Sequence, residues 1–118
     1  MVNKKNCIFC KIVKGEIKSE IVLEGDRFIA FVDTKPKVSG HTLIVPKNHF
    51  VTVLDIPNTW GEELLRFTKK VVDKLMVDYK ADGFNLIMNN LEAAGQVVPH
   101  AHLHVLPRKE GDGFRVSG

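Results

Sequence analysis

Apolar side chains recur at steps of three and four positions in one long stretch of the chain, between residues 60 and 79. The apolar positions are Trp60, Leu64, Phe67, Val71, Leu75 and Tyr79. The polar positions between them are Glu62, Arg66, Lys69, Lys70, Asp73 and Lys74. This spacing predicts an amphipathic helix of about six turns, with one face in a core and the other in solvent. Asn58 is a suitable N-cap, and Asp82-Gly83 predicts the end of the helix.

Short β-prone runs contain most of the remaining apolar residues. They are Ile21–Glu24, Phe28–Val32, His41–Val45, Phe84–Met88 and His100–Leu106, the third and fifth stopped by Pro46 and Pro107. Residues Ile8–Val13 are predicted to form a short helical turn that ends near Gly15. Gly25-Asp26 predicts a hairpin between the first two runs, and Asn89–Gln96 is predicted to be a loop. One long helix among strands with mostly short connections predicts an α+β fold, an antiparallel sheet with residues 1–118 as a single domain.

Composition and charge exclude several classes of protein. The chain has 118 residues and a formal net charge of +3, from 17 Lys+Arg and 14 Asp+Glu. With no long basic run, that charge is too small for a nucleic-acid-binding protein. Apolar residues make up 44% of the chain, which is typical of a globular domain, and no apolar run approaches the roughly 18 residues of a membrane span. The first residues lead into no signal-peptide segment, so we expect a cytoplasmic protein.

Three of the five histidines alternate with apolar residues in the run His100-Ala-His102-Leu-His104-Val. Alternate side chains of a strand share a face, so the three imidazoles lie together and the apolar side chains enter the core. Neighbouring imidazoles weaken packing and disfavour each other's protonation, which favours a functional role: a metal site, or a nucleophile or acid/base. The first and third lie roughly 13 Å apart along an extended strand. One ion cannot bind all three, so we expect them to divide their roles.

Cys7 and Cys10 form a Cys-x-x-Cys motif close to the N-terminus. In a reducing compartment such a pair is half of a metal site, a redox pair, or two thiols of the core. The redox alternative requires a strand before the motif and a helix after it, and the sequence predicts no such strand.

The chain resembles the histidine-triad (HIT) family of nucleotide hydrolases and transferases. Its defining motif, His-φ-His-φ-His-φ-φ with φ apolar, is complete in His100-Ala-His102-Leu-His104-Val-Leu106. Other blocks resemble the family in order: residues 8–13, 28–33, 40–47 and 95–98. The resemblance extends from Cys7 to Pro107. It implies a five-stranded antiparallel sheet with one long and one short helix, continued into ten strands in a homodimer, which also covers an exposed edge.

The resemblance also implies an activity. The substrate is a small nucleotide, usually an adenylate, linked through its α-phosphorus to an amine or another phosphate. His102 attacks that phosphorus to form a nucleotidyl-histidine, and water then releases the nucleoside monophosphate. A neutral imidazole is a good nucleophile near pH 7, and its other ring N–H needs an acceptor, which in the family is a backbone carbonyl of the same strand.

Further site residues follow from the matching positions of the family. His41 and His104 hold the phosphate and tune charge around it, and Gln96 joins them in the catalytic set. Asp33 accepts hydrogen bonds from the ribose hydroxyls. The residues implied to contact the nucleotide are Ile8, Phe9, Ile17, Phe31, Asp33, Asn89, Gly95, Gln96, Val97, Val98, His102 and His104. At the position of Val97, many family members have Ser or Thr, whose hydroxyl group helps hold the phosphate or the leaving group. The side chain of Val97 cannot donate such a hydrogen bond.

A zinc-containing subset of the family implies a second role for four residues. Cys7, Cys10, His49 and His100 correspond to its Cys2His2 ligands, a set suited to a closed, structural Zn²⁺ site. If His100 binds zinc, the proton for the leaving group must come from elsewhere.

Three functions remain open at this stage. The first is hydrolysis of adenosine phosphoramidates, as in the Hint-like branch, which the block from Ile8 to Ile12 favours. The second is hydrolysis of dinucleoside polyphosphates, as in the Fhit-like branch, which the run from His104 to Lys109 and the loop before Gln96 favour. The third is a nucleotide-binding interaction module with negligible turnover, for which Val97 is the only sign.

Overall fold

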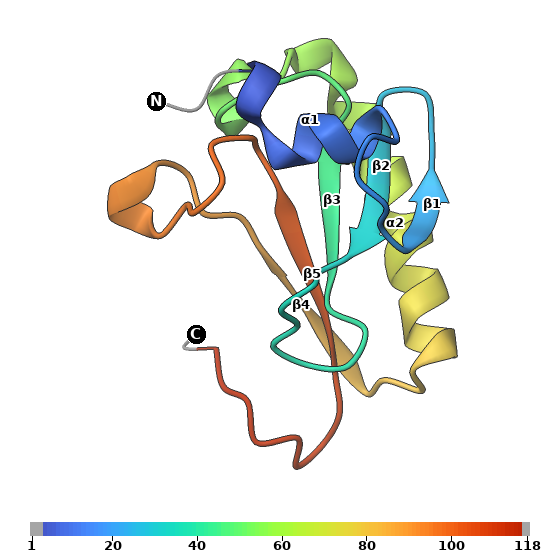
Figure 1. Ribbon diagram of the computed structural model, residues 1–118. Helices are drawn as coiled ribbons and strands as arrows, with labels where there is room; N and C mark the ends of the chain where they lie inside the picture. The colour runs from blue at the N-terminus through green and yellow to red at the C-terminus, as the bar shows by residue number, and fades with distance from the viewer. Residues whose placement is uncertain (1–3, 117–118) are drawn as a thin grey trace.

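Five strands form one antiparallel sheet in the computed structural model, which describes residues 4–116 (Figure 1). The strands are β1 (Ile21–Glu24), β2 (Phe28–Val32), β3 (Thr42–Pro46), β4 (Gly83–Ile87) and β5 (Leu103–Arg108). Their order across the sheet is β1-β2-β3-β5-β4, and every neighbouring pair is antiparallel. The predicted α+β fold with a five-stranded antiparallel sheet is therefore confirmed.

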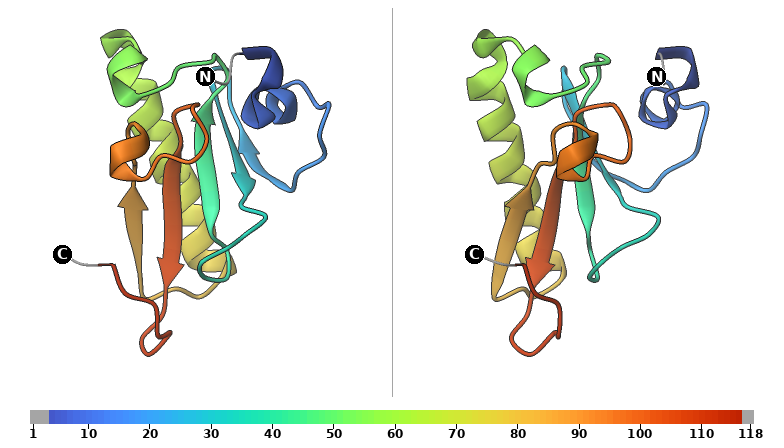
Figure 2. Two further views of the ribbon diagram at one scale, coloured as in Figure 1. Left: turned by 60° about the vertical axis from the view of Figure 1, so that its left-hand side comes forward. Right: turned by 90° about the vertical axis from the view of Figure 1, so that its left-hand side faces the viewer.

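The two α-helices lie on opposite faces of this sheet, as Figure 2 shows in both views. The helices are α1 (Ile8–Val13) and α2 (Gly61–Asp78), and four short 3-10 turns are η1 (Lys4–Asn6), η2 (Val53–Asp55), η3 (Asn58–Trp60) and η4 (Glu92–Ala94). Within residues 4–116, no helix is both long enough and apolar enough to cross a bilayer.

Each helix covers its own apolar core. The core under α2 contains Phe28, Ala30, Ile44, Phe67, Val71, Val72, Leu75 and Val105. The core under α1 contains Cys7, Phe9, Cys10, Ile12, Ile29, Phe31, Leu43 and Val45. Alternate residues of β2 and β3 enter the two cores in turn, as the period of a strand requires. The apolar stripe of the long helix is thus correctly predicted, and both cysteines lie at the core beneath the short helix.

The ends of the long helix differ from the prediction. Asn58 is not its N-cap, because Asn58–Trp60 form the 3-10 turn η3 behind Pro57, and α2 starts at Gly61 with no side-chain cap. Its C-terminal end is Asp78, earlier than Asp82-Gly83, because Lys80 takes a left-handed φ of 50° that ends the helical turn. Gly83 is instead the first residue of β4, which begins and ends one residue earlier than the predicted run. Strand β3 begins and ends one residue later than predicted and includes Pro46.

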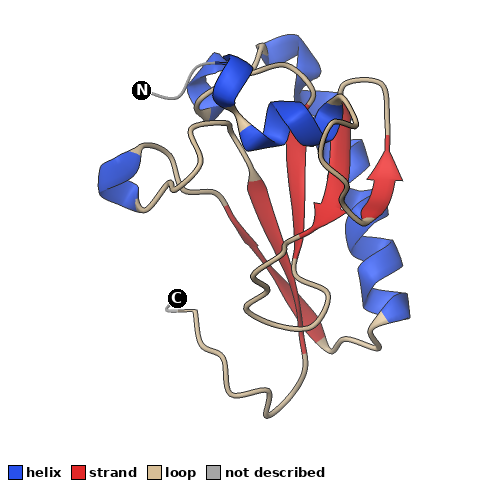
Figure 3. Cartoon of the chain, viewed as in Figure 1, coloured by secondary structure: helices blue, strands red, loops and turns tan. Residues whose placement is uncertain are grey.

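The largest difference concerns the histidine run. Strand β5 begins at Leu103, so His100 and His102 precede it in a segment drawn as loop in Figure 3. The ladder between β3 and β5 ends at the pair Ile44 and Leu103, and Val45 and Pro46 are paired with β2 alone. Pro107 does not stop β5, because at its other end the ladder with β3 stops at the pair Thr42 and Val105, and Pro107 is paired only with Phe84 of β4.

The prediction that residues 1–118 form one domain stays a prediction, because residues 1–3 and 117–118 lie outside the described part of the chain. The Met-Val-Asn start of the sequence, on which the expectation of no signal peptide partly rests, lies there too.

Gly40 and Gly61 provide a matched test of this packing. A Cβ on Gly40 would lie 2.8 Å from the ring of Tyr79 and 2.9 Å from Pro107, at a backbone φ of +84°. We expect Gly40→Ala to lower the free energy of unfolding by roughly 2–4 kcal/mol, from left-handed strain and overpacking. Gly61→Ala places its Cβ in open space at the start of α2 and should raise that free energy by about 0.4–1 kcal/mol. Urea denaturation measures both changes, and equal stability of the two variants would contradict the described packing.

Candidate active site and metal cluster

The segment that carries His100 and His102 is held by contacts outside the β-ladder. The backbone N–H of Ala101 donates to the carbonyl of Phe50 at 2.7 Å. The ring of His100 donates through Nε2 to the carbonyl of Pro46 at 2.8 Å. Pro46 is the last residue of β3 and Phe50 follows that strand, so the end of β3 and the stretch after it lie beside the histidine segment.

His102 has one ring nitrogen protonated and the other free. Its Nδ1 lies 2.7 Å from the carbonyl oxygen of His100, which can only accept, so Nδ1 carries the proton. Nε2 of the neutral ring therefore has an available lone pair. The side chain is 5% exposed, and this burial lowers the pKa of His102, although its hydrogen bond to His100 and the charge of Asp33 oppose the shift. The ring of Phe9 stands edge-on to His102 at 5.1 Å.

His41 and His104 form a hydrogen-bonded pair of defined polarity. The backbone N–H of Lys37 donates to Nδ1 of His41 at 3.0 Å, so the proton of a neutral His41 ring is on Nε2. That Nε2–H faces Nδ1 of His104 at 2.9 Å, which leaves the ring proton of His104 on its own Nε2. Burial, followed by the charges of His102 and His41, lowers the pKa of His104 to about 4. Burial also lowers the pKa of His41, which is 1% exposed.

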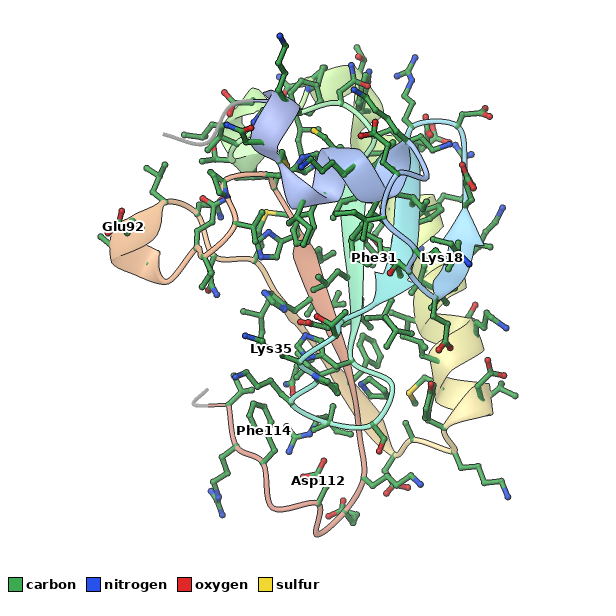
Figure 4. All side chains as sticks on the ribbon, in the orientation of Figure 1. Lys18, Phe31, Lys35, Glu92, Asp112 and Phe114 are labelled. Atoms are coloured by element: carbon green, nitrogen blue, oxygen red, sulfur yellow. The ribbon has the colours of Figure 1, made fainter. Side chains whose placement is uncertain are left out.

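Asp33 brings the negative charge closest to this histidine pair. One of its carboxylate oxygens lies 3.6 Å from Nε2 of His41, and the other accepts the backbone N–H of Lys35. Its charge raises the pKa values of His41, His102 and His104 against the larger effect of burial. Lys35, labelled in Figure 4, lies on the loop between β2 and β3.

Four other side chains form a compact group of nitrogen and sulfur ligands. Nδ1 of His100 lies 3.3 Å from Sγ of Cys7 and 3.5 Å from Sγ of Cys10. Nδ1 of His49 lies 3.2 Å from Sγ of Cys10, and all four ligand atoms are within 4.8 Å of one another. The cysteines are free thiols. This group of Cys7, Cys10, His49 and His100 could hold a metal ion.

The chemistry of this group fits a tetrahedral ion. Bond lengths of about 2.3 Å to sulfur and 2.0–2.1 Å to nitrogen separate neighbouring S and N ligands by roughly 3.6 Å in a tetrahedron. The separations of 3.2–3.5 Å are close to that value. His100 also donates its second ring N–H to the carbonyl of Pro46, the usual partner of a metal-bound imidazole, and so directs the lone pair of Nδ1 at the sulfurs.

A second group, Asp33, His41 and His104, also has its ligand atoms within 4.8 Å of one another. It fits a metal poorly, because the N–H of Lys37 occupies the lone pair of His41 Nδ1 and leaves a proton on Nε2, the atom that faces the group. The two clusters therefore divide the histidines: His100 belongs to one and His104 to the other. The different roles that the sequence predicts for these histidines stay a prediction.

The apolar residues predicted to surround the base lie in two environments. Phe9 and Phe31 are buried and meet edge-to-face at 5.5 Å, and Phe9 is the one of the two that contacts His102 (Phe31 is labelled in Figure 4). Ile8 is 46% exposed and Ile17 36% exposed. Ile17 lines a hollow of about 320 Å³ between the end of α1 and strands β1 and β2.

The loop from Asn89 to Val98 is tied to the stretch after β3. Gln96 is 8% exposed and uses both ends of its amide: Oε1 accepts the N–H of Leu91 at 2.6 Å, and Nε2 donates to the carbonyl of Val51 at 2.6 Å. Gly95 has a φ of +93° and lies beside the Asn89 side chain. Val98 packs on the core under α1, whereas Val97 is 88% exposed. Glu92, labelled in Figure 4, lies on η4 at the far end of this loop.

Two backbone groups of the site were not predictable from the residue pattern: the carbonyl of Pro46 and the N–H of Lys37. Each fixes the tautomer of a histidine. The sequence contains no signal for them, because every residue except proline offers the same N–H and every residue the same carbonyl. The redox alternative for the cysteines lacks its context, since within residues 4–116 the pair is preceded by the turn η1 and by no strand.

Comparison with known proteins gives consistent matches. The HIT domain family matches residues 14–111 of this chain. An uncharacterised HIT-like protein of Methanocaldococcus jannaschii is 45% identical over 109 residues, which is 91% of this chain and 82% of that protein. An adenosine 5′-monophosphoramidase of Candida albicans is 37% identical over 114 residues, 93% of this chain and 75% of that protein.

Solved structures agree with the sequence matches. A Streptococcus mutans protein superposes with a TM-score of 0.91 at 41% identity, covering 100% of this chain and 74% of that one. A HIT family member of Bacillus subtilis superposes with a TM-score of 0.89 at 37% identity, covering 96% and 81%. The motif, the fold and these relatives agree, and this chain belongs to the HIT family.

Proposed function

We propose that this HIT protein is a nucleotide hydrolase that cleaves adenosine phosphoramidates at the α-phosphorus through a nucleotidyl-histidine. Among its relatives are adenosine 5′-monophosphoramidases of Candida albicans and Saccharomyces cerevisiae, at 37% and 38% identity. The observation that carries the proposal is the tautomer of His102, whose Nδ1–H is bound to the carbonyl of His100. A nucleophilic imidazole needs this free Nε2 lone pair near neutral pH.

In the first step Nε2 of His102 forms a bond to the α-phosphorus, and the phosphorus–nitrogen bond to the leaving amine breaks. The amine takes up a proton as it leaves. The Nε2–H of His104 donates to a non-bridging phosphate oxygen, where charge develops in the transition state. His41 keeps His104 in the donating tautomer through their 2.9 Å contact. His41 is buried and His104 partly buried, and since desolvation lowers the pKa values of both imidazoles, they act here as neutral groups.

In the second step water attacks the phosphorus of the nucleotidyl-histidine, the bond to His102 breaks, and the nucleoside monophosphate is released. His100 has no proton for the leaving group, because Nδ1 faces the cysteine sulfurs and Nε2–H is bound to Pro46. Water or the substrate supplies that proton in this scheme.

The remaining predicted residues recognise the nucleotide or shape its site. Ile8, Phe9, Ile17 and Phe31 provide an apolar surface for the base, and Asp33 accepts from the ribose hydroxyls. Asn89, Gly95, Val97 and Val98 form the loop beside the phosphate. We assign Gln96 to the same loop, which its bonds to Leu91 and Val51 hold in place.

Two alternative functions use the same site. Hydrolysis of dinucleoside polyphosphates needs the same nucleophile with a phosphate leaving group. A binding module with negligible turnover is favoured by Val97 alone, which is exposed and has no hydroxyl group to hold the leaving group.

Adduct trapping tests the proposed nucleophile. After rapid acid-free quenching of a reaction with an adenosine phosphoramidate, intact-mass spectrometry should detect one adenylyl group on the chain. His102→Ala removes the attacking nitrogen and should abolish the adduct and lower kcat/KM by at least about 10⁴-fold. Gly61→Ala, on the surface of α2, is the control and should keep both. An adduct that persists in His102→Ala excludes His102 as the nucleophile.

Substrate comparison separates the three functions. The phosphoramidate should turn over with a higher kcat/KM than diadenosine tri- or tetraphosphate. The reverse order would favour the polyphosphate hydrolase, and nucleotide binding without turnover of either substrate would favour the binding module.

We also propose that the ion held by Cys7, Cys10, His49 and His100 is a structural Zn²⁺. Two thiolates and two imidazoles are a usual zinc set, and bound zinc joins α1 to the ends of two strands in a small domain.

Metal analysis tests this assignment. Protein purified without chelator should contain about one zinc per chain, and chelation should lower Tm by several degrees. Cys10→Ser should lose the metal, because a neutral hydroxyl replaces a thiolate ligand. Metal-free protein as purified, with a Tm that chelator leaves unchanged, would exclude the site.

We propose that the protein is a homodimer joined along β4. This strand is at the edge of the sheet, and its side chains Phe84 and Leu86 are 45% and 46% exposed. A second copy paired along it would continue the sheet and cover both side chains.

Sedimentation equilibrium tests the dimer, which should have twice the 13.3 kDa mass of the chain. Leu86→Lys should shift it toward monomer by placing a charge at the interface. Leu54→Lys is the matched control, because Leu54 is 89% exposed on η2 and should leave the mass unchanged. A wild-type protein that stays monomeric at high micromolar concentration would refute the proposal.

A further inference from the structure

Leu91 has a backbone conformation that leucine rarely adopts. Its φ is 72° and its ψ is 161°, a combination that is essentially restricted to glycine. Within residues 4–116, the one other non-glycine residue with a positive φ is Lys80, just after helix α2. Strain of this kind persists only where surrounding groups hold it, and it is concentrated at functional sites.

The fold holds Leu91 in this conformation without burying its side chain. Its N–H donates to Oε1 of Gln96 at 2.6 Å, and its carbonyl accepts the N–H groups of Ala94 and Gln96 at 3.1 and 3.2 Å. The side chain is 58% exposed. A glycine would form the same backbone bonds without strain, so the packing of the described chain does not explain the leucine.

Val97 is a second exposed apolar residue of the same loop, at 88%. This loop is anchored beside the histidine segment. The side chain of Gln96 donates to the carbonyl of Val51, and the N–H of Ala101 donates to the carbonyl of Phe50. Since these two carbonyls belong to consecutive residues, the loop is held next to the segment that carries the proposed nucleophile.

The loop and the proposed nucleoside contacts lie on opposite sides of the histidine strand. In the sheet, β5 lies between β3 and β4, with β2 beyond β3. Phe31 and Asp33 are on β2 or directly after it, whereas the loop continues from β4. Figure 1 shows η4 of this loop and strand β2 on opposite sides of β5. A phosphate at His102 and His104 whose nucleoside points toward β2 directs its other substituent toward this loop.

The loop offers apolar contacts and no cation. Residues 88–98 include no Lys or Arg, and their one charged side chain is the acidic Glu92. Both ends of the Gln96 amide are already bound to backbone groups. A leaving phosphate would therefore find no counter-charge on this loop, whereas an alkyl or aryl group would remove Leu91 and Val97 from water.

We propose that Leu91 and Val97 form the leaving-group contact of the site, and that the preferred substrates are adenosine phosphoramidates whose amine carries an alkyl or aryl group. This rests on the proposed function of His102. The reacting bonds are unchanged: Nε2 of His102 bonds to phosphorus, the phosphorus–nitrogen bond breaks, and the amine takes a proton from water or the substrate. Leu91 and Val97 determine specificity by covering the apolar part of the amine.

A matched pair of substrates tests this assignment. The adenosine phosphoramidates of butylamine and methoxyethylamine have equal chain lengths, and the second has an ether oxygen in place of one methylene group. The measured quantity is the ratio of their kcat/KM values, compared between variants so that the difference in amine basicity cancels. Val97→Thr keeps the shape of valine and replaces a methyl group with a hydroxyl group. Val77→Thr is the matched control, because Val77 is exposed on α2, on the sheet face opposite α1.

We expect Val97→Thr and Leu91→Ala each to lower the butyl-to-methoxyethyl ratio about fourfold, the factor that burial of one methylene group is worth. Val77→Thr should leave the ratio unchanged. Leu91→Gly should lower the ratio as Leu91→Ala does, with a Tm several degrees above that of Leu91→Ala, because glycine adopts this backbone conformation without strain.

Turnover of both substrates with a ratio that neither Val97→Thr nor Leu91→Ala changes would overturn the leaving-group assignment and leave the proposed function intact. A wild type that hydrolyses neither phosphoramidate would overturn both. A Tm of Leu91→Gly below that of Leu91→Ala would remove the strain on which the assignment rests and so overturn it. A changed sedimentation mass in Leu91→Ala would overturn it as well, by placing the loop at an interface between subunits.

Discussion

The hydrogen bond from Nδ1–H of His102 to the carbonyl of His100 is the contact on which the proposed chemistry of this site depends. It is short, at 2.7 Å, and buried, and it decides which ring nitrogen has a free lone pair. The N–H of Ala101, in the same peptide unit as that carbonyl, donates to Phe50, and the ring of His100 donates to Pro46. The ring centroid of His104 lies 5.0 Å from that of His102.

The two histidine clusters differ because different lone pairs are occupied. The N–H of Lys37 takes the lone pair of His41 Nδ1, so this histidine becomes a donor to His104 and a poor metal ligand. The carbonyl of Pro46 takes the proton of His100, so this histidine directs a lone pair at two sulfurs. One donor and one acceptor of the backbone therefore separate the pair proposed to bind phosphate from a group that could hold a metal ion.

Burial explains how an anionic substrate could be bound by a chain of such modest charge. The pKa values of His41, His100, His102 and His104 are all lowered, chiefly by burial. Neutral imidazoles keep their lone pairs for attack and for metal binding, and they still donate N–H groups of fixed direction. The proposed site therefore needs oriented dipoles in a desolvated place, and the net charge of +3 is no obstacle.

Much of the fold follows from local patterns. The apolar stripe that includes Phe67 and Val71 predicted α2, because the burial period of a helix depends only on its secondary structure. The short β-prone runs predicted all five strands. The ends were less predictable. Asn58 had the right residue type for an N-cap, but it follows Pro57 in a 3-10 turn. His100 had the right pattern for a strand, but the ladder between β3 and β5 ends at Leu103.

The sequence by itself predicted that the five histidines and two cysteines serve at least two functions, because three alternating imidazoles on an extended strand would lie too far apart for one ion. It also determined the family, through the triad motif and the ordered blocks around it. The resemblance already implied which histidines accompany the cysteines, and only the tertiary structure decided which nitrogen of each triad ring is protonated. The physical reason is that tautomers depend on backbone groups such as the carbonyl of Pro46, 54 residues away in the chain, and sequence patterns do not encode such contacts.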